Sequence, residues 1–491
     1  MNPSPGHKPI KRIISFFKKG SQTLNAQRHG ISPHLEMQVV ALLQEQDITR
    51  SSQEIKSYLR LLQGDVCETV EQLTCLSLAE VGILVGVSCS KNLRGVENAS
   101  GTSCYIDTIL FAMYSQETAF DCLLHSRPLK KAGADLLQTK CRFFVNLLRS
   151  NCLIRSETVE GLRSQLIKCG WRANRDSQED AVEFFLFLTG VFELPFLPLN
   201  IQLFHGALED ASDDKFTADR VLALSLPPSL FPSKLPPSRP SDLSLISGLS
   251  NRSDAPSREV ISVETLLLDY FCSNRIQGIR RSLQPSQQSE CEKTAVTDAW
   301  SMLKLLPFYT SQNELGVVSE IREADLSDPD LILPLMIKRY TQAPDGTYIR
   351  DSRHIALSTE INFNNFIKRL DEPIAEIPTK EYRLQLKAVV CHIGTSLQSG
   401  HYIVYVRDTV TNDWLELDDL SQEKVRRFTS VRSATKAFAR MGQNAYLLLY
   451  KLSTGPSSSF RADGAFMDAK VARKLQVQEL SNLKEKSCPI Q

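Results

Sequence analysis

The sequence lacks the features that mark metal-binding, secreted and membrane proteins. Its 12 cysteines form no Cys-x-x-Cys pair, so no zinc-ligand spacing is visible. It has no signal peptide and no apolar run long enough to span a bilayer. Its 57 basic and 56 acidic residues nearly cancel, which gives no reason to expect nucleic acid as a partner. We therefore expect a cytoplasmic or nuclear protein with free thiols and with neither a metal nor a cofactor.

Both ends of the chain carry features that bear on membrane association. Residues 1–30 contain no acid, whereas basic residues surround several apolar ones, which is typical of a disordered basic arm. The last four residues, Cys488-Pro489-Ile490-Gln491, fit the C-a-a-X pattern of prenylation. One farnesyl chain on Cys488 would anchor weakly, so the basic arm would supply the second signal. The sequence thus leaves a weak membrane association open.

Apolar residues recur at helical spacing three times within residues 31–80, which predicts three short helices. Ser51 and Glu54 match a capping box, and Gly64-Asp65 is typical of a helix end. The arrangement resembles a ubiquitin-associated domain, and a plain helical extension is the alternative. Near the other end of the chain, residues 453–491 are predicted to form a flexible linker and a helical tail.

A cysteine stands where a central helix is predicted to begin. Residues 101–104 run Gly-Thr-Ser-Cys, and apolar residues then recur at helical spacing from Ile106 to Met113. The N-terminus of a helix offers unpaired N–H groups and the positive end of the helix dipole, which stabilise a thiolate and can hold an oxyanion. Cys104 is therefore a candidate nucleophile, although packing is the commoner role for such a cysteine.

A histidine and two aspartates far downstream complete a candidate catalytic set. Residues 384–390 and 402–406 have the pattern of two strands, joined by a loop with two glycines that places His401 where the second strand begins. A further strand at 414–417 is followed by Asp418-Asp419. Cysteine, histidine and aspartate are the residue types of a nucleophile, a base and an orienting acid.

Stretches of the chain resemble, in the same order, the motifs of the ubiquitin-specific protease family. They are the cysteine box at 101–110, the Gln-Asp-Ala motif at 178–184, the Phe-x-Gly and Leu-x-Leu elements at 204–206 and 222–226, the Leu-Pro…Lys-Arg-Phe strand at 333–340, the histidine box at 400–406 and 414–419, and the closing strand at 445–450. Several weak motifs in the right order are more specific than any one of them. The resemblance assigns a catalytic domain to residues 92–452.

The resemblance implies an α+β fold of the papain-like cysteine peptidases, preceded by the small three-helix domain. A helical thumb would carry Cys104, and an antiparallel β palm would carry His401. The fingers would be reduced or free of zinc, because Cys272 and Cys291 are the only cysteines in that region and lie far apart. A disordered insertion rich in proline and serine is expected at about residues 227–260.

The resemblance also implies an activity. The chain would cleave the isopeptide or peptide bond after the C-terminal glycine of ubiquitin, and ubiquitin conjugates would be its partners. Cys104 would act as the nucleophile, His401 as the base and Asp418 as the acid that orients the base, with Asp419 as the fallback. The alternatives are a catalytically weak or inactive ubiquitin-binding pseudoprotease and a transglutaminase-type acyl transferase, which shares the Cys, His, Asp order.

Further residues are expected to support this chemistry. The family usually has an oxyanion-stabilising asparagine five residues before the cysteine, but Ala99 stands there in this chain and Asn98 lies one position away. Asn98 and Ser103 are expected to support the oxyanion. The residues expected along the substrate channel are Gln178, Asp180, Gly400 and Tyr402.

Overall fold

The computed structural model of the chain describes residues 32–87, 93–172, 178–205, 210, 213–227, 261–272, 274–282, 294–306, 310–312, 318–320, 331–342, 346, 348–368, 381–396 and 399–455. The predicted arm at 1–30, nearly all of the predicted insertion, the tail beyond residue 455, Gly206 and Cys488 lie outside these residues. The chain forms two compact units. One unit holds the residues up to Ala99 together with Leu124–Trp171, and the other holds Ser100–Leu123 and the residues from Arg172 onward.

The first unit is helical. Its helices are α2 (Pro33–Gln44), α3 (Ser52–Leu61), α4 (Val66–Glu80), α6 (Ala134–Arg149) and α7 (Ser156–Lys168). Ser51 caps α3 in a capping box with Glu54, and Asp65 caps α4, as the sequence indicates. The three short helices expected within residues 31–80 are thus confirmed. They share a buried core formed by Val39, Leu43, Ile55, Leu59, Val70 and Leu73.

The second unit combines helices with sheets and confirms the α+β class. Its helices are α5 (Cys104–Tyr114), α8 (Ala181–Val191), α9 (Val263–Cys272) and α10 (Val431–Asn444), and the 3-10 helix η2 (Ala119–Leu124) ends where the first unit resumes. Every residue of α5 is buried, so this helix lies inside the unit rather than on its surface. Tyr105 of α5 and Phe184 of α8 pack edge to face with ring centroids 5.4 Å apart.

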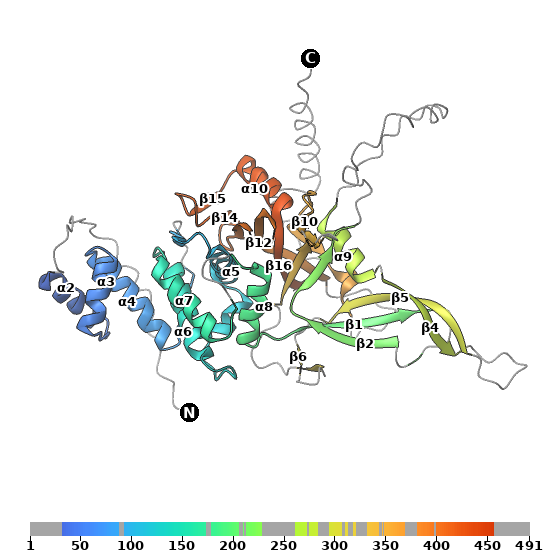
Figure 1. Cartoon of the computed structure of the whole chain (residues 1–491), viewed down its shortest axis with the longest axis horizontal. Coiled ribbons are helices and arrows are strands. Elements are labelled where there is room, and N and C mark those ends of the chain that lie inside the picture. The colour runs from blue at the N-terminus through green and yellow to red at the C-terminus, as the bar shows by residue number, and fades with distance from the viewer. Residues whose placement is uncertain are drawn as a thin grey trace, which may run out of the picture. The chain divides into compact units, whose positions relative to one another are not determined.

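An eight-stranded sheet, which we call the palm sheet, forms the centre of the second unit (Figure 1). Seven strands follow the order β15-β14-β13-β12-β16-β8-β3, and β11 also pairs with β12. The strands are β3 (Leu222–Ser225), β8 (Ile332–Lys338), β11 (Glu360–Asn362), β12 (Glu381–Ser396), β13 (Ser399–Arg407), β14 (Trp414–Leu417), β15 (Val425–Phe428) and β16 (Ala445–Gly455). The pairs are antiparallel as expected, except that β3 runs parallel to β8. Apolar alternation identifies a strand but not its direction.

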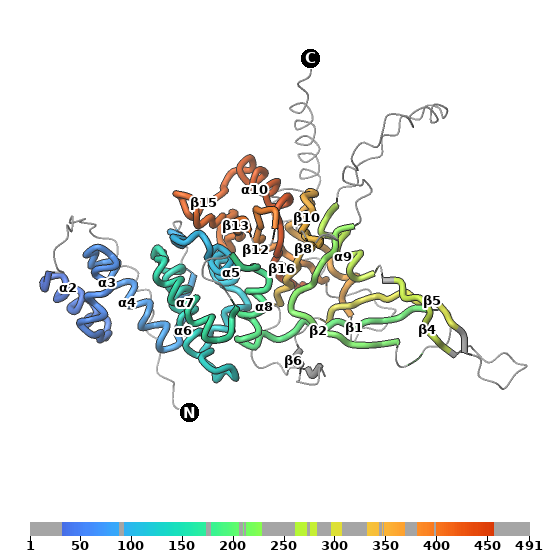
Figure 2. The backbone as a smooth tube through the Cα atoms, in the orientation of Figure 1, coloured from blue at the N-terminus to red at the C-terminus, as the bar shows by residue number. Residues whose placement is uncertain are grey.

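The palm sheet joins parts of the chain that are far apart in sequence. β16 lies between β12 and β8, and Figure 2 shows its backbone running beside theirs. A continuous core of buried side chains lies against the sheet and includes Leu266 and Phe271 of α9, Met441 of α10 and Leu448 of β16. This core fixes the sheet that carries His401.

A second sheet, which we call the fingers sheet, has the order β2-β1-β5-β4. Its strands are β1 (Leu197–Phe204), β2 (Asp214–Asp219), β4 (Asn274–Ser282) and β5 (Thr294–Leu305). Arg281 of β4 contacts Asp213 at 2.5 Å, and His205 contacts the same carboxylate at 2.9 Å. The described part of the fingers is therefore a formed sheet in which an ion pair joins β4 to the segment before β2.

Two short ribbons complete the second unit. They are β9 (Tyr340–Gln342) paired with β10 (Tyr348–Arg350), and β6 (Thr310–Gln312) paired with β7 (Val318–Glu320). Among the described residues, no helix combines the length and the apolar character that crossing a bilayer requires.

Candidate active site

Cys104 is the first residue of α5, as the sequence predicts. Its side chain is 0% exposed, and Ser103 precedes it at the cap position. The Ser103 hydroxyl donates to the Asp107 carboxylate at 2.7 Å, so it does not cap the helix with its side chain. Cys104 therefore lies at the N-terminus of α5, and the neighbouring Ser103 hydroxyl is hydrogen-bonded to Asp107, one turn further along the helix.

The surroundings of Cys104 favour the protonated form of its thiol. Burial, followed by the negative charge of Asp419, raises the pKa of this thiol to about 12, while hydrogen bonds with the backbone of Tyr402 and Tyr105 lower it. Burial and the Asp419 charge therefore oppose the stabilisation of a thiolate that the sequence predicts at this helix N-terminus.

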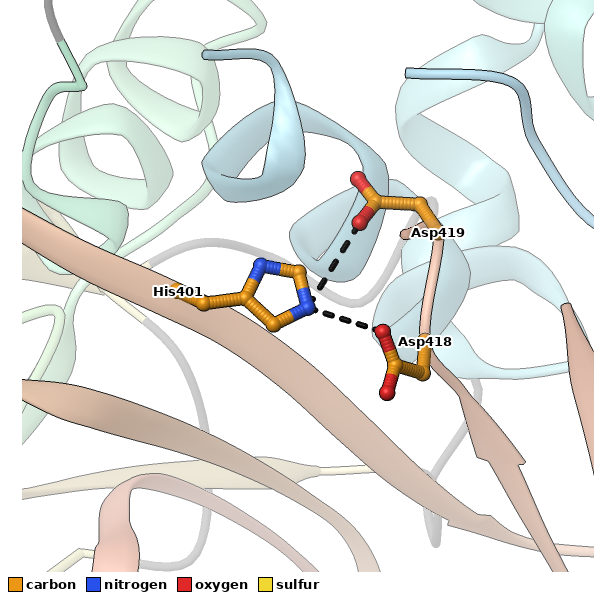
Figure 3. A group of neighbouring side chains, drawn as sticks. All are labelled: His401, Asp418 and Asp419. Atoms are coloured by element: carbon orange, nitrogen blue, oxygen red, sulfur yellow. Dashed lines mark hydrogen bonds and ion pairs between the residues drawn. The ribbon is translucent and has the colours of Figure 1, made fainter. Parts of the chain in front are cut away.

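His401 lies on β13 and faces two carboxylates (Figure 3). Its Nε2 atom lies 2.9 Å from Asp418 Oδ1 and 3.7 Å from Asp419 Oδ1. The hydrogen bond from His401 lowers the pKa of Asp418, and burial opposes this effect. An ionised carboxylate only accepts, so Nε2 carries the hydrogen. His401 Nδ1 is buried and has no hydrogen-bond partner among the described residues, so it is the nitrogen that can take a proton.

The two aspartates follow β14 and are fixed by the backbone around them. The Asp418 N–H donates to the Lys424 carbonyl at 2.9 Å, and the Asp418 carboxylate accepts from the Leu420 N–H at 3.3 Å. The Lys424 ammonium donates to the Asp419 carbonyl at 2.6 Å. The side chain of Asp419 is fully buried.

Glu416 anchors the end of β14 just before these aspartates. Its buried carboxylate accepts from the Tyr405 hydroxyl and is paired with Arg426 and Arg440, each contact being 2.8 Å long. A buried carboxylate requires such partners. Because Tyr405 belongs to β13, this cluster ties the strand that carries Asp418 to the strand that carries His401.

The nucleophile and base candidates share one site in the second unit. α5 packs against β13, and the sulfur of Cys104 has a hydrogen bond with the backbone of Tyr402, the residue after His401. Asp419 acts electrostatically on Cys104 and lies near His401 as well. Asp419 thus links Cys104 at the start of α5 to the group formed by His401 and Asp418.

The strands around His401 extend further than the sequence indicates. Residues 391–396 were expected in the loop but continue β12, and His401 is the third residue of β13 rather than its first. The reason is that residues 391–393 pair directly with residues 401–403. Gly400 has a φ of +129°, and a Cβ there would lie 2.5 Å from the Ile393 carbonyl oxygen and 2.7 Å from Gly394 Cα. Only glycine fits where these two backbones approach so closely.

The other expected site residues lie in several places. Gln178 is nearly buried, and its Nε2 atom lies 3.4 Å from Nε2 of His392. Asp180 caps α8 through the Val182 and Glu183 N–H groups, and its other oxygen accepts from the Tyr446 hydroxyl at 2.5 Å. These contacts tie α8 to β16. Asn98 belongs to the first unit.

His392 is the residue that the sequence reasoning missed. It lies on β12, is 1% exposed and stacks on Tyr402 with ring centroids 4.4 Å apart. It is the second residue of the Cys391-His392-Ile393-Gly394 segment, in which apolar alternation breaks at a histidine. That break was the signal in the sequence that could have identified His392. The residues that surround His392 in the structure could not be predicted from the sequence.

Among the described residues, one group has ligand atoms close enough together to hold a metal ion. It consists of His401, Asp418 and Asp419, whose ligand atoms lie within 4.8 Å of one another. One carboxylate oxygen is already bonded to the imidazole, and the resulting pair has the geometry of a base and its orienting acid. We therefore interpret the group as part of a nucleophilic site rather than as a metal site.

Residues 94–450 match the family model described as Ubiquitin carboxyl-terminal hydrolase. Ubiquitin carboxyl-terminal hydrolase 48 from Danio rerio is 34% identical over 110 residues, which are 19% of this chain and 10% of that protein. The protein of the same name from Gallus gallus is 30% identical over 133 residues, which are 24% of this chain and 13% of that protein. The chain thus matches only a small part of the length of these relatives.

A solved structure described as the SAGA Ubp8/Sgf11/Sus1/Sgf73 DUB module bound to ubiquitin aldehyde is similar to the chain with a TM-score of 0.47. The sequence identity is 16%, and the match covers 78% of this chain and 75% of that one.

Proposed function

Because the chain belongs to the ubiquitin carboxyl-terminal hydrolase family, we propose that it cleaves the bond after the C-terminal glycine of ubiquitin. The bond is an isopeptide bond to a lysine or a peptide bond, and Cys104 is the nucleophile. The observation that carries the proposal is the His401 ring, which donates to Asp418 through Nε2 and leaves Nδ1 without a partner in the described residues.

The reaction begins with a proton transfer. The raised pKa of Cys104 favours a start from the thiol, and a preformed thiolate–imidazolium pair is the alternative. His401 takes the thiol proton at Nδ1 as the sulfur attacks the glycine carbonyl. Asp418 stabilises the imidazolium that forms, because its carboxylate already faces Nε2.

The remaining steps return the enzyme to its starting state. His401 gives the proton to the departing amine, the C–N bond breaks, and ubiquitin remains bound to Cys104 as a thioester. Water then attacks the thioester while His401 takes a proton from it, and the thiolate leaves and is reprotonated. The first N–H groups of α5 support the oxyanion.

Ala99 stands where the family usually has the oxyanion-stabilising asparagine, and this difference affects the expected rate of hydrolysis. Removing one oxyanion donor typically costs about two to three orders of magnitude in rate. With alanine in place of the usual asparagine, the backbone N–H groups carry more of this task. We therefore propose a slow hydrolase rather than a fast one, and a ubiquitin-binding pseudoprotease is the alternative that this substitution favours.

A ubiquitin derivative with a C-terminal electrophile tests the proposal. The wild-type protein should gain the mass of one ubiquitin, and the Cys104→Ala variant should gain none. Cys67→Ala is the matched control, because this cysteine is exposed on α4 and should not affect labelling. Unlabelled wild-type protein that still binds ubiquitin would instead support the pseudoprotease. Incorporation of an amine without isopeptide cleavage would support the transglutaminase-type reaction.

A further inference from the structure

A second histidine, His392, lies buried beside the strand that carries the proposed base. His392 pairs with Tyr402 across β12 and β13, next to the pair formed by Ile393 and His401. Its ring stacks on the Tyr402 ring at an interplanar angle of 22°. One face of the His392 ring therefore supports the residue that directly follows His401.

The β9–β10 ribbon holds His392 through two contacts. Tyr340 and Arg350 face each other in the register of this ribbon. The Tyr340 hydroxyl makes a hydrogen bond with His392 Nδ1, and Arg350 donates to the His392 carbonyl at 3.1 Å. The ribbon thus fixes both the ring and the backbone of this histidine.

The other ring nitrogen, Nε2, faces Gly394 of β12 and Gly400 of β13. His392 makes a hydrogen bond with the Ser399 backbone. A Cβ built on Gly394 or on Gly400 would lie 3.1 Å or 3.0 Å from Nε2, so both glycines pack closely around this atom. The first residues of β13, Ser399 and Gly400, therefore lie on the Nε2 side of the ring.

These contacts favour one tautomer. When Nδ1 accepts from the Tyr340 hydroxyl, the hydrogen lies on Nε2, the atom that faces Gly394 and Gly400, and is available to the Ser399 backbone. The opposite tautomer would rely on two long contacts, 3.5 Å from the Tyr340 hydroxyl to the Gly394 carbonyl and 3.4 Å from Gln178 to Nε2. Contacts at those distances are weak hydrogen bonds at best.

The surroundings also keep the ring neutral. Burial, then the positive charge of Arg350, lowers the pKa of His392 to about 4, with a smaller effect from His401. The other titratable groups that face the ring are Tyr340, Tyr402 and Tyr446. A neutral ring can accept at Nδ1 and donate at Nε2 at the same time.

We propose that the Tyr340 hydroxyl and the His392 ring act as positioning residues that hold Ser399 and Gly400 at the start of β13 and so set the orientation of His401. This inference rests on the proposed hydrolase function. The family motif that residues 333–340 resemble ends in phenylalanine, which has no hydroxyl, so the contact from Tyr340 is a feature of this chain.

The smallest test removes one oxygen atom. Tyr340→Phe should lower kcat about fivefold on a fluorogenic ubiquitin C-terminal amide, which is about 1 kcal/mol, and leave KM within about twofold. Tyr348→Phe is the matched control, because Tyr348 lies on the same ribbon and is exposed. A Tyr340→Phe enzyme with the same kcat as the control overturns the proposal.

A second variant distinguishes hydrogen bonding by the His392 nitrogens from simple packing of its ring. His392→Phe keeps an aromatic ring against Tyr402 but lacks both nitrogens. If His392 only fills space, this variant should keep the wild-type kcat at an unchanged melting temperature, and that result would also overturn the proposal. We expect kcat to fall at least about tenfold, since Ser399 loses its hydrogen bond and the Tyr340 hydroxyl loses its acceptor.

The ring itself can be observed without turnover. In protein labelled with ¹⁵N-histidine, His392→Gln identifies the His392 signals among the 8 histidines. We expect the His392 ring to be the neutral Nε2–H tautomer from about pH 5.5 to 8. The ¹⁵N signals of this ring should change in Tyr340→Phe. An Nδ1–H tautomer, or titration near the ordinary value of about 6.5, contradicts the inference. If the wild-type protein fails to hydrolyse ubiquitin, the proposed function fails, whereas this spectrum still decides whether the support exists.

Discussion

Nε2 of His401 lies 2.9 Å from Oδ1 of Asp418 and farther, 3.7 Å, from the neighbouring Asp419. This difference favours Asp418 over Asp419 for the orienting role that we propose. Asp418→Asn should lower kcat by about 10³- to 10⁴-fold, because an amide can present its N–H to Nε2 and stabilise the wrong tautomer. Steady-state hydrolysis of a fluorogenic ubiquitin amide measures the effect, and KM should change little. A larger loss in Asp419→Asn than in Asp418→Asn would transfer the role to Asp419.

Asp419 should instead control the acidity of the nucleophile. Its negative charge is the second cause, after burial, of the raised pKa of Cys104. Asp419→Asn removes that charge, so the pKa should fall and the thiolate fraction at pH 8 should rise, by about tenfold for each unit of the fall. The rate of alkylation of Cys104 by iodoacetamide reports this fraction. An unchanged or slower alkylation rate would show that the carboxylate does not act on the sulfur.

Gly400→Ala should disable the site. The new Cβ would overlap the Ile393 carbonyl oxygen and Gly394 Cα, and the start of β13 before His401 would have to move. We expect kcat/KM to fall at least about 100-fold, since small displacements of a catalytic group are costly. Gly346→Ala is the matched control, because it has a φ of +83° but no atom within 4 Å of the added Cβ. It should cost about 1–2 kcal/mol in stability and leave kcat/KM unchanged. Equal activities of the two variants would contradict this interpretation.

The ion pair in the fingers sheet should stabilise the protein in a pH-dependent way. Burial would raise the pKa of Asp213, but the hydrogen bond from Arg281, together with those from the Asp210 backbone and His205, lowers it well below its ordinary value. A carboxyl whose pKa is lowered by folding stabilises the fold above about pH 4 and loses that effect as the pH falls. Arg281→Gln should therefore lower the melting temperature at pH 7, and the difference from wild type should shrink below about pH 4.

Arg275→Gln provides the control for this prediction. Arg275 pairs with Asp298 at 2.6 Å on the same sheet, but the two side chains are 55% and 42% exposed. Exposed pairs contribute little, about 0–1 kcal/mol, so this variant should melt close to wild type. If both variants melt alike at pH 7, the Arg281–Asp213 pair has no special role in the sheet.

Local patterns in the sequence predicted the parts of the site that depend on local structure. Helical spacing after Cys104 placed it at the first residue of α5, and alternation identified the strands that hold His401 and precede Asp418. These features follow from the periods of helices and strands. The order of the motifs supplied the family, to which residues 94–450 belong.

What remained hidden depends on contacts between distant segments. The charge of Asp419 on Cys104 joins residues more than 300 positions apart, and no periodicity encodes it. The contact of Tyr340 with His392 and that of Arg281 with Asp213 also arise only when the strands assemble. The helix α10 was not identified from the sequence, and α10 carries the Arg440 that pairs with Glu416.

The place of β16 between β12 and β8 has a consequence for biosynthesis. The last strand of the palm sheet to leave the ribosome is an inner one, so a nascent chain that has not reached Ala445 leaves facing edges of β12 and β8 open. Contacts this distant in sequence form late. The palm sheet that carries His401 is therefore completed only after nearly the whole domain has been translated.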